Sequence, residues 1–427
     1  MGCAACHTGE LRFAGKRFRV DGGPGLIDFS SFEAAVLDAM EATINDQSKF
    51  QRFAVRAAAV GIQADAMKTE MQRQYSVVKA RQQTNYTPVP YGYGRLDAFG
   101  QIFNAVATNI LEIPENKRVP NAPVSFPALW DAPHFDLVQW NGSAPNSGPG
   151  PLIQNITTAL AVYGSATVVG SNSKTHYNSS VNIKNLGDIQ NLVYQLKSPQ
   201  WPTQHFGALD PDKVVYGQSV YEKNCLSCHS LVDRDDEKRK IKVNLTDLEI
   251  VGTDPQMVEN FINAKSSSGV IEGEKLMMFA GDKIDDVEPT IDLVAHVAVG
   301  VALDQLFDSI SSFIKGYHSV DSAAINLTPR YYKGRPLDGM WASAPFLHNG
   351  SVPNLYELLL PVDQRSKTFY VGSKEFDPIV VGFDTKAKIN TSLFDTSLLG
   401  NSNVGHEFGV DLSAEDKDSL LIYLKSI

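Results

Sequence analysis

Two copies of a Cys-x-x-Cys-His motif constrain this chain more than any other feature of its sequence. The first copy consists of Cys3, Cys6 and His7, and the second consists of Cys225, Cys228 and His229. This motif is the attachment signal for a c-type haem, in which two thiols bond to the haem vinyl groups and the histidine ligates the iron. The sequence therefore predicts two covalently bound haem c groups, with His7 and His229 as iron ligands.

The alternatives for these cysteines are a zinc site and a thiol redox pair. The chain has four cysteines, and the two motifs use all of them. Zinc sites usually bring two Cys-x-x-Cys pairs within about 15–20 residues of each other. These pairs lie more than two hundred residues apart. Neither alternative explains why both pairs are followed directly by histidine, so haem attachment is favoured.

Length and charge bound the remaining possibilities. A chain of 427 residues is long enough for two domains. The net charge of −10 and the pI near 5.4 argue against nucleic acid as a partner and suit a basic redox partner protein. The most apolar stretch, 291–307, contains His296 and two aspartates, so we expect a buried helix there and no membrane-spanning segment.

Haem attachment also predicts where the protein works. Covalent attachment of this type takes place outside the cytoplasm, so we expect a periplasmic or secreted protein. Export requires a signal peptide, and there is no room for one before Cys3. We therefore expect that the signal peptide was lost with a missing N-terminal segment.

The C-terminal part, 206–427, is typical of a complete cytochrome c domain used for electron transfer. Asp210 is placed to cap a helix that begins at Pro211 and leads directly into the second haem motif. Ser413 and Asp416 predict a capping box at the start of the last helix, which should pack against the first one.

The N-terminal part, 1–205, is predicted to be the catalytic haem domain, although no helix precedes its motif. Ser30 and Glu33 suggest a capping box for a first helix, and two more helical patterns follow. The segment 110–205 is rich in Pro, Gly, Asn and Ser, which favours long loops. The expected fold is therefore mainly α, with two cytochrome c-type haem domains, long irregular loops and little β structure.

The ligand on the far side of each iron decides the function, because a capped iron carries electrons and an open one binds oxygen or peroxide. For the second haem, His406 is the best candidate, since it lies on a polar, Gly-containing loop just before the last helix. The competitors are His348, Met340 and the pair Met277–Met278.

Three histidines follow the first motif within its own domain: His134, His176 and His205. His176 lies in a very polar stretch and is expected at the surface. His134 lies among Trp130, Phe135 and Trp140, which are dense enough to line an apolar catalytic pocket or to form an aromatic core. Trp130 or Trp140 could also carry electrons between the two haems.

Six segments spread over the chain form a specific set: CAACHTGE, DGGPG, LWDAPHFDLVQWNG, NCLSCHS, GRPLDGMWASAPFLHNGSVPNLYELLLP and GNSNVGHEFG. Together they resemble the bacterial dihaem cytochrome c peroxidase superfamily, most closely its rubber-oxygenase branch, which also includes fatty-acid dioxygenases. The region that precedes the first haem in such proteins is not matched, in agreement with the expected truncation.

The resemblance implies a reactive N-terminal haem on His7 and a six-coordinate C-terminal haem held by His229 and His406. In the true peroxidases the loop corresponding to His406 typically presents a methionine, which raises the haem potential. This chain has Gly405, His406 and Glu407 there, and this difference argues against an ordinary hydrogen-peroxide reductase.

The activity implied is oxygenation of an apolar, unsaturated small molecule or polymer with O2, with Trp130, Phe135 and Leu129 as loosely transferred pocket walls. The alternatives are a dihaem peroxidase that reduces H2O2 and a two-haem electron carrier without enzymatic activity. A carrier needs a strong second ligand on the first iron, and His134 is the residue in question. A structural Ca²⁺, common in the superfamily, is a further cofactor to test for.

Overall fold

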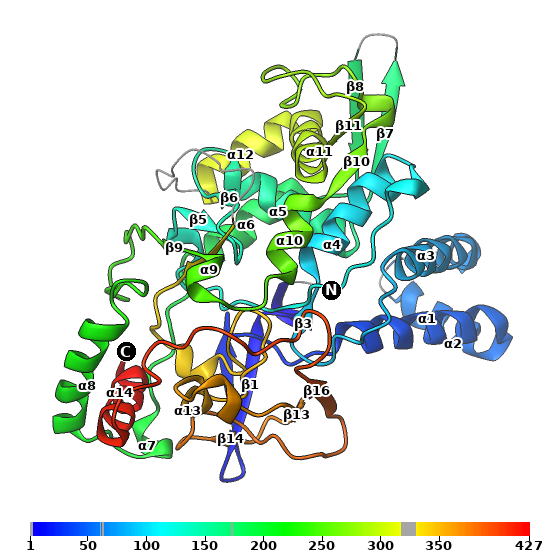
Figure 1. Ribbon diagram of the computed structural model, residues 1–427. Coiled ribbons are helices and arrows are strands. Elements are labelled where there is room, and N and C mark those ends of the chain that lie inside the picture. Colours follow the sequence, from blue (N-terminus) through cyan, green and yellow to red (C-terminus); the bar gives the residue numbers. More distant parts are fainter. Residues whose placement is uncertain (1–2, 60, 62–63, 172–173, 317–329) are drawn as a thin grey trace.

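The structure is a computed structural model that describes residues 3–59, 61, 64–171, 174–316 and 330–427 (Figure 1). It is 44% helical and 16% strand, so the expectation of a mainly α protein with little β structure is wrong, and the fold is mixed α/β. The described strands pair as short two-stranded antiparallel sheets: β1 (Thr8–Phe13) with β2 (Lys16–Asp21), β3 (Arg95–Leu96) with β4 (Val124–Ser125), β5 (Leu137–Val138) with β6 (Ala144–Pro145), β7 (Ala166–Ser171) with β8 (Lys174–Ser179), β9 (Asn244–Asp247) with β12 (Tyr331–Gly334), β10 (Lys265–Ser267) with β11 (Val287–Pro289), β13 (Thr368–Val371) with β16 (Ser392–Asp395), and β14 (Phe376–Asp377) with β15 (Gly382–Phe383).

The hairpin β1–β2 shows how these short strands are paired. It begins directly after His7 and is closed by Ala14 and Gly15, whose φ angles are 48° and 76°. Two successive residues with positive φ form the tight turn that matches the twist of antiparallel strands. The sheets are too short for a strong alternating pattern, and their partners are set by turns such as this one.

Helices α8 (Pro211–Asn224) and α14 (Ala414–Ser426) pack side by side, as the sequence predicts (Figure 1). The predicted caps are confirmed, because Asp210 accepts hydrogen bonds from the start of α8, and Ser413 forms a capping box with Asp416. Gly217 lies at the crossing, where a Cβ would overlap with the backbone of α14 and lie 2.8 Å from Cβ of Tyr423. The helices approach this closely because Gly217 has no side chain.

Helices α1 (Phe29–Asn45), α2 (Gln47–Ala58) and α3 (Ala64–Thr84) form a unit at one side of the molecule (Figure 1). The predicted capping box of Ser30 and Glu33 is wrong. The N-cap is Asp28, which accepts a hydrogen bond from the backbone of Ser31, and Glu33 is buried at 3.9 Å from Arg81.

The segment 110–205 is more regular than a set of loops, because it contains β4 to β8, α5 (Gly150–Val162) and α6 (Ile183–Val193). Helix α5 packs on α11 (Thr290–Asp304), which is buried as expected from its apolar sequence. The remaining helices are α4 (Ala98–Phe103), a π-helical turn (Asn104–Ile110), α7 (Thr203–Phe206), α9 (Leu248–Val251), α10 (Gln256–Asn263), α12 (Leu306–Gly316) and α13 (Leu355–Leu358).

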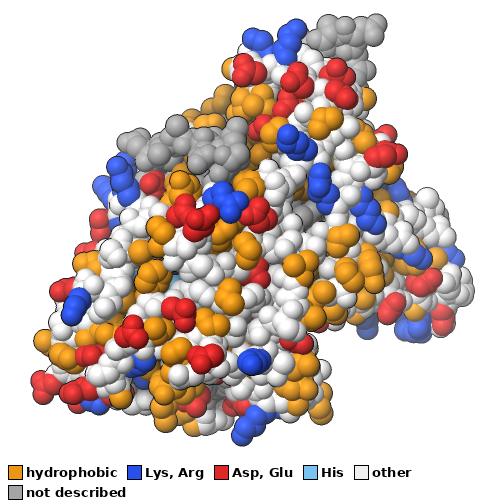
Figure 2. All heavy atoms as spheres, in the orientation of Figure 1, with side chains coloured by type: hydrophobic (Ala, Val, Ile, Leu, Met, Phe, Trp, Pro, Cys, Tyr) orange, Lys and Arg blue, Asp and Glu red, His pale blue; other side chains and the backbone are white. Residues whose placement is uncertain are grey.

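Within the described residues, no single helix is long and apolar enough to cross a membrane. Thr290–Asp304 and Leu306–Ile314 meet that test only as a pair bent by 97°. On the face shown in Figure 2, acidic and basic side chains are intermixed with hydrophobic ones.

Candidate haem sites

The second haem motif lies at the end of α8. Helix α8 delivers Cys225 and Cys228 to one loop, and the hydroxyl of Tyr221 on α8 donates to the carbonyl oxygen of His229 at 2.5 Å. The Nδ1–H of His229 donates to the carbonyl oxygen of Arg335 at 2.7 Å. This bond fixes the tautomer and leaves Nε2 free to bind a metal, as is usual for metal-ligating histidines.

His406 faces His229 across a gap of the right size for an iron atom. The centres of the two imidazole rings are 6.2 Å apart. Two imidazoles that share one metal ion, with metal–nitrogen bonds of about 2.0 Å, have ring centres about 6.3 Å apart. The Nδ1 of His406 is buried without a hydrogen-bond partner, and burial lowers the pKa of this histidine to about 4. Both rings are therefore neutral and suited to ligate iron.

The loop that carries His406 is held firmly by its backbone. The N–H of His406 donates to Val251 at 2.7 Å, and Arg365 donates to the carbonyl oxygens of Gly405 at 2.8 Å and of His406 at 3.2 Å. Gly405 and His406 both have positive φ, 73° and 49°. A Cβ on Gly405 would overlap with the backbone of Gly252, so glycine permits this close approach.

His348, one of the competitors of His406, has other partners. The ring of His348 stacks on Tyr332 with 4.1 Å between ring centres, and its Nε2 lies 3.0 Å from the Tyr332 hydroxyl. That hydroxyl donates to Asp254, so Nε2 of His348 carries a proton and is occupied. Met340 packs against an apolar cluster, and Met278 lies in a tight turn with φ of 64°.

The first haem motif is a short 3₁₀ turn, in which the N–H of His7 donates to the carbonyl oxygen of Cys3 at 3.0 Å. The Nδ1–H of His7 donates to the carbonyl oxygen of Pro127 at 2.9 Å, which repeats the arrangement at His229. Gly25 packs on the motif, and a Cβ there would lie 2.9 Å from the carbonyl oxygen of Ala5. Burial lowers the pKa of His7 to about 4, so its ring is neutral as well.

The ring contacts of His7 differ from those of His229. The aromatic ring in contact with His7 is Phe126, at 6.3 Å between centres and edge-on. Among the described residues, no second imidazole is in ring contact with His7. The two sites therefore share one kind of proximal histidine, and a facing histidine is found only at the second.

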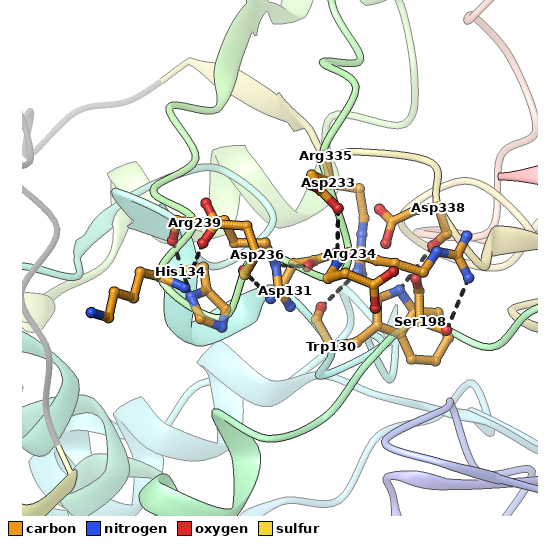
Figure 3. A network of polar contacts seen from close by, with 12 residues as sticks. Trp130, Asp131, His134, Ser198, Asp233, Arg234, Asp236, Arg239, Arg335 and Asp338 are labelled. Atoms are coloured by element: carbon orange, nitrogen blue, oxygen red, sulfur yellow. Dashed lines mark hydrogen bonds and ion pairs between the residues drawn. The ribbon is translucent and has the colours of Figure 1, made fainter.

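Trp130, His134 and Phe135, which the sequence predicts to line the catalytic pocket, are all buried. The indole of Trp130 is fully buried and donates to the carbonyl oxygen of Asp338 at 2.9 Å. His134 hydrogen-bonds through Nδ1 to the carbonyl oxygen of Arg239 at 3.0 Å, and Phe135 lies under Lys333. Trp130 and His134 lie in a buried polar network that also contains Asp131, Arg239 and Arg335, which we call the seam (Figure 3).

This seam contains ionised groups that sequence reasoning missed. Arg239 donates to Asp131 at 2.6 Å, and both are buried. Arg335 donates to the carbonyl oxygens of Ala128 at 3.3 Å and of Trp130 at 3.5 Å. The sequence around Arg239 is a run of mixed charges, which is typical of a solvated loop, and only the fold shows that this arginine is buried.

The indole of Trp140 donates to the carbonyl oxygen of Ser125 at 3.2 Å. His176 is exposed, as expected, and His205 lies against Phe18 of β2. Neither is in described contact with a haem-motif histidine.

The residues present fit covalently bound haem. All four cysteines are free, and burial raises the pKa of Cys6 and of Cys225 to about 11, so both remain thiols. Within the described part of the chain, no group of three or more His, Cys, Asp or Glu is arranged to hold a metal ion, so the expected Ca²⁺ gains no support from such a cluster.

Comparison with known proteins agrees with these sites. Residues 331–370, which contain Arg335 and His348, match the model of a family described as RoxA-like, cytochrome c-like. This match indicates a haem-containing oxidoreductase that carries covalently bound haem c.

Two relatives come from Sinorhizobium fredii (strain NBRC 101917 / NGR234). The uncharacterized protein y4iJ is 31% identical over 468 residues, covering 100% of this chain and 76% of y4iJ. The uncharacterized protein y4iM is 22% identical over 307 residues, covering 69% of this chain and 60% of y4iM. The chain belongs to the same family as y4iJ.

Proposed function

We propose that this protein binds two haem c groups and activates O2 at the N-terminal one to oxygenate an apolar, unsaturated substrate. The observation that carries the proposal is the difference between the two sites. His229 faces His406 at the spacing of a doubly ligated iron, whereas His7 is in ring contact with Phe126 alone among the described aromatic and histidine rings. A capped iron suits electron transfer and an open one suits oxygen chemistry.

When bound at His7, the haem supplies the iron at which O2 reacts. The chain's own contribution begins with Pro127, whose carbonyl oxygen accepts the Nδ1 proton of His7 and so orients the ring. Phe126, which precedes Pro127 in the sequence, is buried and packs edge-on against this ring, so it helps to hold the ring in place.

Electrons reach the first site from the second through the seam, in our proposal. The carbonyl oxygen of Arg335 accepts a hydrogen bond from the ring of His229, and the side chain of Arg335 donates one to the carbonyl oxygen of Trp130. Trp130 is three residues from Pro127, which holds His7. This arrangement supports Trp130 as the bridge.

We further propose a periplasmic or secreted location, because haem c is attached outside the cytoplasm, and a redox partner protein that supplies electrons. The substrate class remains an apolar alkene, either a polymer or a smaller molecule such as an unsaturated fatty acid.

The test is an incubation of the reduced, haem-loaded protein with isotopically labelled dioxygen and unsaturated substrates. The proposal expects product that contains label from O2 without added peroxide. Turnover of H2O2 with a reduced cytochrome, without labelled product, would contradict the proposal and identify the protein as a peroxidase. Trp140→Phe is the control for Trp130→Phe, and it should retain product formation while the protein is kept reduced.

A further inference from the structure

Two buried carboxyl groups in the seam, Asp131 and Asp338, lie close enough to interact, and both are drawn in Figure 3. Asp131 is 1% exposed and Asp338 is 5% exposed. Oδ2 of Asp131 and both side-chain oxygens of Asp338 are without a hydrogen-bond donor. Ionised carboxylates only accept hydrogen bonds, so a bond between the two requires a proton on one of them.

The surroundings decide which carboxyl group holds that proton. Asp131 is ion-paired with Arg239 at 2.6 Å. Burial and the negative charge of Asp131 raise the pKa of Asp338 to about 6, against the opposing effect of Arg335. Two carboxylates in contact cannot easily both be charged, which is why one of them keeps its proton. The other charged or titratable groups around the pair are His134 and Asp236 on the Arg239 side, and Tyr221 on α8.

The pair is close to the second haem site without touching an expected iron ligand. Tyr221, which donates to the carbonyl oxygen of His229, is near enough for the charge of Asp338 to raise its pKa. Arg335, which accepts from the ring of His229, interacts with both carboxyl groups. Asp338 also lines a cavity of about 320 Å³, whose rim includes the exposed Asp233, so protons can enter from solvent.

We propose that Asp338, paired with Asp131, binds the proton that accompanies reduction of the second haem, a role that rests on the proposed bis-histidine ligation. A haem held by His229 and His406 would gain one negative charge on reduction by an external one-electron donor, and this charge would favour protonation nearby. Asp338 then takes one proton from solvent water through the cavity and releases it on reoxidation. Charge in the buried seam is thereby balanced during electron transfer past Trp130.

The test is the midpoint potential of the low-spin haem, measured by mediated titration of the haem-loaded protein between pH 5 and 8. The wild-type potential should fall as the pH rises above 6, with a slope approaching 59 mV per pH unit, the value for one proton per electron. Asp338→Asn should remove this slope. Asp235→Asn, an exposed carboxylate on the same cavity, should leave it unchanged.

A second variant covers the case in which Asp338→Asn does not fold. Because the negative charge of Asp131 raises the pKa of Asp338, Asp131→Asn should move the sloping range to lower pH without abolishing it. A flat wild-type potential, or a slope that survives Asp338→Asn, refutes the inference while the proposed ligation stands. Absence of a low-spin haem overturns both the ligation and the inference.

Discussion

Replacement of Asp131 by asparagine tests how much the buried ion pair with Arg239 contributes to stability. The side chains of Arg239 and Asp131 are 6% and 1% exposed, and Nε of Arg239 lies 2.6 Å from Oδ1 of Asp131. Asparagine keeps the shape and removes the charge, which leaves Arg239 as a buried cation. Loss of one partner from a buried ion pair costs about 3–5 kcal/mol. Asp338 ionises more easily once Asp131 is neutral, and this offsets part of the loss. We therefore expect the free energy of unfolding to fall by about 3 kcal/mol.

The same substitution at an exposed pair is the control. Lys213 and Asp418 join α8 to α14, with side chains 46% and 54% exposed. Exposed pairs contribute about 1 kcal/mol or less, so Asp418→Asn should have little effect. The assay is urea unfolding of the haem-loaded protein at pH 7, followed by circular dichroism. Equal losses for Asp131→Asn and Asp418→Asn would refute the view that burial makes the first pair indispensable.

Three further predictions concern other parts of the molecule. Burial lowers the pKa of His348 to about 3, far below its unfolded value near 6.5, so stability is lost as the pH falls from 6.5 towards 3. His348→Gln should reduce the slope of stability against pH by one proton, about 1.4 kcal/mol per pH unit, and an unchanged slope contradicts the assignment. Gly217→Val should overlap with α14 and lower stability by about 1–3 kcal/mol in thermal unfolding, whereas no change would mean that the helices are not in contact there. Trp130→Phe removes the hydrogen bond to Asp338 and should slow electron transfer between the haems at least tenfold in flash-reduction kinetics, with haem content retained; an unaltered rate excludes Trp130 as the bridge.

Local sequence signals were sufficient for the parts of the site formed by neighbouring residues. The two haem motifs, the cap of α8 at Asp210 and the capping box of α14 each depend on residues within a few positions of one another, and the helical parts are confirmed. His406 was chosen because its loop is polar, contains glycine and precedes the last helix. Its position opposite His229 depends on Gly405 and the backbone bonds of Arg365, which no local pattern reveals.

The seam and the strands show what sequence reasoning lacked. Arg239 and Asp131 are 108 residues apart, and their pairing follows from the fold rather than from either segment. A run of mixed charges is typical of a solvated loop, and most of the charged residues around Arg239 are indeed exposed. Arg239 itself is buried. The hairpin turn at Ala14 and Gly15 was a usable signal for strands, since a glycine between short alternating segments favours a tight turn.

The claim that one iron is open and the other is capped is tested most directly by carbon monoxide binding. The measurement is a carbon monoxide difference spectrum of the dithionite-reduced protein, with total haem quantified, for the wild type and for His406→Ala. The account predicts binding at about half of the haem in the wild type and at nearly all of it in the variant, because loss of His406 opens the second iron. Absence of binding in the wild type would mean that both irons are capped, and it would contradict the proposed oxygen chemistry.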